Sequence, residues 1–172
     1  MQLPSPVVQP AGTGVDEPGV AGTPDRRMSV RARALVWEHL CMDQRLDRGG
    51  RSALHYAAGD GDIDQVVALI AGGADVDLAD GAGFTPLHFA AQQGHAAVAD
   101  KLIAAGASID VRNQFGNTPL WVALMNVRDE DGEIVSRLLA AGSDPDAKNN
   151  HGMSPRAIAE IVANYDLKRF LE

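Results

Sequence analysis

The sequence repeats itself with a period of 33 residues, and this period limits the possible folds more than any other feature. The segment Asp47–Ala58 is matched 33 residues later by Asp80–Ala91, and a further 33 residues on by Asn113–Leu124. A fourth copy opens at Asn149, three residues later than the period requires, because the segment 127–133 is longer than its counterparts. Such a period indicates a stack of similar units, each in contact with its neighbours.

Each copy carries the signals for a tight turn followed by two helices. Glycine stands fourth in every copy, where a turn can use positive φ, and Ser or Thr stands sixth, where its hydroxyl can cap a helix. Proline follows in all copies but the first and suits the first helical position. Apolar residues at helical spacing then predict a second helix with its apolar face in the core: Val66, Val67, Leu69, Ile70; Val98, Leu102, Ile103; Ile134, Val135, Leu138 and Leu139.

The motif at Thr85-Pro-Leu-His-Phe-Ala90, together with the period of 33, resembles the ankyrin-repeat family, in particular its small bacterial members. The resemblance covers residues 47 to about 165. It implies an all-α solenoid of stacked helix-turn-helix units joined by β-hairpin loops. It also implies that His55 and His88 hydrogen-bond the neighbouring hairpin.

On this basis we expect six segments. They are a disordered tail rich in Pro and Gly (1–27), a capping helix from a degenerate repeat (28–46), three repeats (47–79, 80–112 and 113–148, the last with a three-residue insertion) and a C-terminal capping repeat (149–172). An alternative for the first segment is that translation starts naturally at Met28.

Composition excludes several classes of function. The chain has 172 residues, a formal net charge of −8 and a single cysteine, Cys41. The acidity argues against a general affinity for nucleic acid, and one cysteine cannot form an internal disulfide. No apolar run approaches the roughly 18 residues that span a bilayer, and no secretory signal is present at the N-terminus. We therefore expect a cytoplasmic monomer that binds neither nucleic acid nor membrane.

Two groups of residues suggest chemistry, but a structural role explains both better. His55 and His88 occupy the motif's histidine position, and no further metal ligands are expected to converge on them. Asp60, Asp62 and Asp64 alternate as in a calcium loop, but Gly and Glu are missing from the sixth and twelfth places. We expect these acids to favour the start of the second helix, and we expect neither an enzyme nor a cofactor.

The remaining candidate is a surface. In ankyrin proteins the hairpin tips and the exposed side of the first helix form a concave face, whose variable places are the second, third, fifth, thirteenth and fourteenth of each repeat. The acidic insertion at 127–133 is a further candidate contact loop. The resemblance carries the concave face over to these residues: Arg48, Arg51, Phe84, Gln92, Gln93, Gln114, Phe115, Asn117, Met125 and Asn126.

The leading hypothesis is an adaptor or inhibitor that binds one protein through this face. A sharper alternative is an immunity protein or antitoxin, because Gly116-Asn-Thr-Pro-Leu-Trp121 and Asn164-Tyr-Asp166 resemble segments of ankyrin proteins found beside bacterial toxins. Two rivals come from other classes: an enzyme or metal-binding protein that uses the histidines, and a module that only supports a larger assembly.

Overall fold

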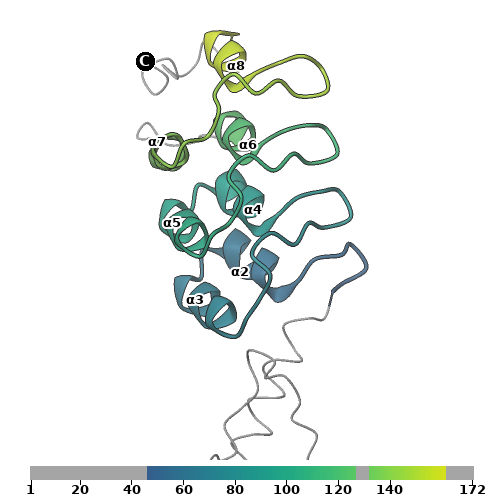
Figure 1. The fold of residues 1–172 in the computed structure, drawn as a ribbon, viewed down its shortest axis with the longest axis vertical. Coiled ribbons are helices and arrows are strands. Elements are labelled where there is room, and N and C mark those ends of the chain that lie inside the picture. The colour runs from purple at the N-terminus through teal and green to yellow at the C-terminus, as the bar shows by residue number, and fades with distance from the viewer. Residues whose placement is uncertain (1–45, 127–131, 162–172) are drawn as a thin grey trace, which may run out of the picture.

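The computed structural model describes residues 46–126 and 132–161, and these form a stack of helix pairs (Figure 1). The helices are α2 (Ala53–Asp60), α3 (Ile63–Ala71), α4 (Pro86–Gln93), α5 (Ala96–Ala104), α6 (Pro119–Asn126), α7 (Glu133–Ala140) and α8 (Pro155–Ile161). No described residue lies in a β-strand, so the described part is an all-α solenoid, as the sequence predicts.

The helices form two columns. The inner helices α2, α4, α6 and α8 pack on one another in succession, and α3, α5 and α7 form the outer column. Hairpin loops link each pair to the next and project on the side away from the outer helices (Figure 1). The inner helices and hairpin loops therefore share one side of the stack, on which the predicted surface residues lie.

The helix starts follow from the hydroxyl and proline signals. Thr85 is the N-cap of α4 and Pro86 occupies its first turn. In the third copy the Thr118 hydroxyl oxygen accepts a hydrogen bond from the N–H of Trp121 at 3.3 Å. A side-chain acceptor here satisfies one of the N–H groups that a helix start leaves unpaired.

The core is built from one leucine per inner helix, packed among alanines. Leu54, Leu87 and Leu120 are fully buried, and the small alanines that follow each of them let neighbouring helices approach closely. One core prediction was wrong: Val67 is 46% exposed, whereas Val66 is fully buried. Adjacent residues of a helix point about 100° apart, so both could not face the core.

The hairpin loops stack by hydrogen bonds between backbones. Gly81 donates its N–H to the carbonyl of Gly49 at 2.6 Å, and Gln114 to that of Ala82 at 2.9 Å. Asn150 donates in the same way to Phe115 at 3.0 Å. The loops therefore add a second ladder of contacts beside the helices.

Several predictions concern residues outside the described part of the chain. These are the tail at 1–27, the capping helix at 28–46 apart from Leu46, most of the insertion at 127–133, and everything after residue 161. They stay predictions.

Two glycines test the stacking of the hairpins against a matched control. Gly116 and Gly152 have the same φ of +76°, but a Cβ on Gly116 would lie 2.7 Å from the backbone nitrogen of Asn150, whereas one on Gly152 would meet nothing within 4 Å. We expect Gly152→Ala to lower the free energy of unfolding by the cost of the left-handed conformation alone, about 1 kcal/mol. Gly116→Ala should cost at least about 1 kcal/mol more, because the hairpins must separate. Urea unfolding of both variants measures this, and equal losses would contradict the proposed contact.

Candidate functional site

The first residue of each repeat holds its hairpin loop in one conformation. The Oδ1 of Asp80 accepts hydrogen bonds from the N–H groups of Ala82 and Phe84, both at 2.9 Å. The Oδ1 of Asn113 accepts in the same way from Phe115 at 2.9 Å and Asn117 at 3.0 Å. The side chains at the tip of each loop therefore project from a fixed backbone.

The fifth residue of one repeat pairs with the first residue of the next. Arg51 donates its Nε–H to Asp80 at 3.2 Å, and Asn149 donates its Nδ2–H to the Oδ1 of Asn117 at 2.8 Å. Burial opposes ionisation of Asp80, but the N–H groups of Phe84 and Ala82 and the Arg51 guanidinium outweigh it and lower its pKa. Arg51 and Asn117, both predicted as partner contacts, therefore also join neighbouring repeats.

His55 and His88 bridge neighbouring repeats, as expected. The Nδ1 of His88 accepts a hydrogen bond from the N–H of Thr85 at 3.1 Å, and its Nε2–H donates to the carbonyl of Asn117 at 3.1 Å. His55 makes the equivalent pair of bonds with Ser52 and Phe84, each at 3.0 Å. Because an amide N–H only donates and a carbonyl only accepts, both rings are held as the neutral Nε2–H tautomer.

This arrangement leaves the two histidines no free nitrogen for a metal or a substrate proton. Both side chains are fully buried. Burial lowers the pKa of His88 to about 4, against a smaller opposing effect of the Asn117 carbonyl, and burial lowers the pKa of His55 as well. In the described residues, no group of three or more His, Cys, Asp or Glu side chains could hold a metal ion.

The aspartates at the start of α3 act as expected. Asp62 is the N-cap of this helix, and its Oδ1 accepts a hydrogen bond from the N–H of Gln65 at 3.0 Å. Asp64 lies in the first turn, where its charge is favourable for the helix dipole.

None of the ten predicted surface residues is buried, although they divide into two groups. Arg51, Phe84, Asn117 and Asn126 are half-buried; Arg48, Gln92, Gln93, Gln114, Phe115 and Met125 are exposed. The Phe84 ring packs against the rings of His88 and Phe89, with centroids 5.4 and 6.2 Å apart. Phe115 and Met125 remain 47% and 48% exposed. As a partner-binding set, the ten residues stay a prediction.

Four of the exposed residues have no structural task. Within the described residues, the side chains of Arg48, Gln92, Gln93 and Gln114 make no hydrogen bond or ion pair. These side chains add nothing to the fold through polar contacts, so they are available to another molecule.

Tyr56 and Phe89 were missed by the sequence analysis. Tyr56 is 46% exposed on α2 and donates its hydroxyl hydrogen to Asp47, and Phe89 lies half-buried at the same place in the next repeat. The Cζ of Arg51 lies 5.2 Å from the centroid of the Phe89 ring. The tenth place shares a helix face with the thirteenth and fourteenth because residues three and four apart are neighbours, and this spacing could have revealed it.

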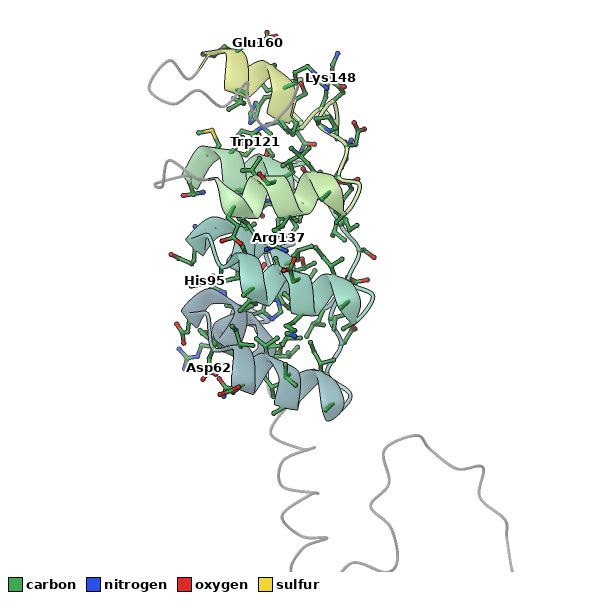
Figure 2. All side chains as sticks on the ribbon, turned by 90° about the vertical axis from the view of Figure 1, so that its left-hand side faces the viewer. Asp62, His95, Trp121, Arg137, Lys148 and Glu160 are labelled. Carbon is green, nitrogen blue, oxygen red and sulfur yellow. The ribbon has the colours of Figure 1, made fainter. Side chains whose placement is uncertain are left out.

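Many of the acidic side chains lie on the outer side of the stack. Figure 2 looks onto the outer helices, where Asp62 and Arg137 are labelled. Arg137 of α7 forms an ion pair with Asp100 of α5 at 3.1 Å. In contrast, the surface places on the hairpins and inner helices of the second and third repeats hold no charged residue: Gly81, Ala82, Phe84, Gln92, Gln93, Gln114, Phe115, Asn117, Met125 and Asn126.

Comparison with known families agrees with this geometry. A model of ankyrin repeats in three copies matches residues 29–113 and 54–149, together more than half of the chain. The chain therefore belongs to the ankyrin-repeat family, whose repeats are generally protein–protein interaction modules. Comparison with curated protein sequences gave no match. None of the described helices is long and apolar enough to cross a membrane.

A substitution at His88 separates a structural role from a catalytic one. His88→Ala removes both hydrogen bonds and leaves a cavity, so we expect the free energy of unfolding to fall by about 3–5 kcal/mol. His151→Ala, at an exposed hairpin tip, is the control and should change it by less than about 0.5 kcal/mol. A His88→Ala variant that melts like the wild type would contradict the structural role. Urea unfolding measures both variants.

The lowered pKa of His88 makes stability depend on pH in a defined range. The folded protein disfavours the protonated ring, so the contribution is complete above pH 6.5 and is lost as the pH falls from 6.5 to about 4. Over the whole range the loss should be about 3 kcal/mol, and His55 should add to it in the same direction. Asp80, with its lowered pKa, titrates below its ordinary value of 3.8 and so outside this range.

Urea unfolding at pH 7 and pH 4.5 tests this dependence. The wild type should lose clearly more stability between the two pH values than His88→Gln, which has no titrating ring. Equal losses in the two proteins would show that His88 does not carry the dependence.

Proposed function

We propose that the chain is a protein-binding module that acts as an adaptor or inhibitor through the concave face. This face comprises the hairpin tips and the exposed side of α2, α4 and α6. Repeats of this family generally bind proteins. The observation that carries the proposal is the set of exposed side chains on this face that do nothing for the fold.

Gln92, Gln93 and Gln114 have no partner within the described chain, and Phe115 and Met125 expose about half of their surface. Protein interfaces are depleted of charge at their centre and enriched in aromatic residues and methionine. The concave face of the second and third repeats has this composition. The outer helices differ, because they carry charges such as Asp100 and Arg137 in ion pairs.

The enzymatic alternative has less support. The two histidines that suggested it are buried and held by main-chain groups on both ring nitrogens. A general base must be able to reach the proton that it abstracts, and these rings cannot reach a substrate without breaking the contact between repeats. We therefore propose binding rather than catalysis as the activity of this chain.

Affinity capture with two matched variants of the full chain tests the proposal. Gln92→Glu/Gln114→Glu adds two charges to the concave face at exposed positions without structural partners. Ala68→Glu/Ala97→Glu adds the same two charges to exposed positions on the outer helices α3 and α5. Both variants must first melt like the wild type.

We expect a protein captured by the wild type to be recovered at least about tenfold less with the concave-face variant and equally well with the outer-face variant, since a buried unpaired charge costs several kcal/mol. Quantitative mass spectrometry of the captured proteins measures this. Equal capture by all three proteins, or a loss confined to the outer-face variant, would contradict the proposed face. Blocked activity of a captured toxin would favour the antitoxin alternative over an adaptor.

A further inference from the structure

The third repeat (113–148) satisfies its own polar groups least well. Within the described part of the chain, three buried side-chain atoms lack a hydrogen-bond partner, and all three belong to this repeat: Asn113 Nδ2, Trp121 Nε1 and Ser143 Oγ. A buried polar group without a partner costs about 1–3 kcal/mol. The repeat is therefore less well adapted to stacking than its neighbours.

The same places in the other repeats are paired or apolar. The residue equivalent to Asn113 is Asp80, which accepts from Arg51, whereas Asn113 faces a repeat with Phe84 at that fifth place. The place of Trp121 is taken by His88 in the repeat before, which donates to the next hairpin. Alanine occupies the place of Ser143 in the first two repeats. The stack thus loses specific contacts in the third repeat only.

This repeat also exposes the most apolar surface on the concave face beyond the first repeat. Phe115 lies at the hairpin tip and Met125 in the last turn of α6, and they are 47% and 48% exposed. Neither exposure benefits folding. Positions where a sequence departs from the rules for stability are expected to be functional sites.

Charge indicates which partner this surface fits. In the first repeat the face holds Arg48, Arg51 and Asp60, but the equivalent places from Gly81 onward in the described residues hold no Asp, Glu, Lys or Arg. A charged group of a partner would lose its hydration there without gaining a counter-charge. The net charge of −8 on the chain further disfavours an acidic segment.

The unpartnered amides favour an extended backbone. Gln92, Gln93 and Gln114 each offer a donor and an acceptor, the pair of groups that a peptide unit requires. They come from successive repeats, so a segment that runs along the stack meets them one after another.

We propose that the third repeat anchors an uncharged, extended segment of the partner protein, one of whose apolar side chains packs against Phe115 and Met125. This inference rests on the proposed function and deepens it. The amides of the second and third repeats bind the backbone of the segment, while the anchor supplies most of the affinity.

Selection of random peptides displayed on phage against the immobilised full chain tests the inference without the natural partner. Peptides enriched on the wild type are synthesised, and their affinities are measured by fluorescence polarisation for the wild type and two variants. Phe115→Ser/Met125→Ser removes the anchor. Tyr56→Ser removes a similarly exposed side chain, 46% accessible, from the first repeat of the same face. All three proteins are first shown to melt alike.

We expect the enriched peptides to lack charged residues around an aromatic or long aliphatic residue. They should bind the anchor variant at least about tenfold more weakly and Tyr56→Ser as tightly as the wild type. Introducing Asp beside the anchor residue of a peptide should weaken its binding to a similar extent.

Enriched peptides that are charged, that bind the anchor variant as tightly as the wild type, or that depend on Tyr56 would overturn the inference, and so would the absence of any enriched peptide. These outcomes differ from failure of the proposed function. If captured proteins still depend on Gln92 and Gln114 in the affinity experiment, the concave face binds a partner of another chemistry.

Discussion

The contact between neighbouring repeats is the constraint on which the rest of the structure depends. A unit of two short helices cannot bury its apolar face alone, so each repeat is stable only against the next. In this chain the contact includes a fully buried histidine that joins the helix start of one repeat to the hairpin of the following one. His55 and His88 therefore stabilise both the helix caps and the stacking, and loss of either ring affects two repeats at once.

This constraint divides the surface of each repeat into positions that are committed to stacking and positions that are free. The first and fifth places are paired across repeats, as in Arg51 with Asp80 and Asn117 with Asn149. The second, third and thirteenth places are not needed for this purpose. Their side chains are held at a fixed spacing by a rigid backbone, which is the property that a binding face requires. The third repeat goes further, because it also gives up part of its stacking contacts.

Much of the fold could be predicted from the sequence because the repeated signals have local causes. Thr85 and Pro86 start a helix by capping and by a fixed φ, and both act through neighbouring residues. The role of the histidines was predictable from the family resemblance. Val67 was assigned wrongly because a run of apolar residues does not reveal which of two adjacent side chains faces the core.

The details of the candidate site depend on contacts between repeats and were less predictable. Phe84 and Phe115 are the same residue type at the tips of successive hairpins, yet one ring packs against His88 and the other stays exposed. The difference follows from their fifth and third places in the repeat. The unpaired Asn113 amide likewise depends on the side chain that the preceding repeat presents, which no local pattern encodes.

Amide hydrogen exchange of the full chain, free and in complex with a captured partner, tests the central claim most directly. The account predicts that exchange slows on binding in the hairpin loop 113–117 and at the end of α6, with a smaller effect at 80–84, and that α3, α5 and α7 exchange as in the free protein. Protection concentrated on the outer helices, with the hairpin loops unchanged, would contradict it.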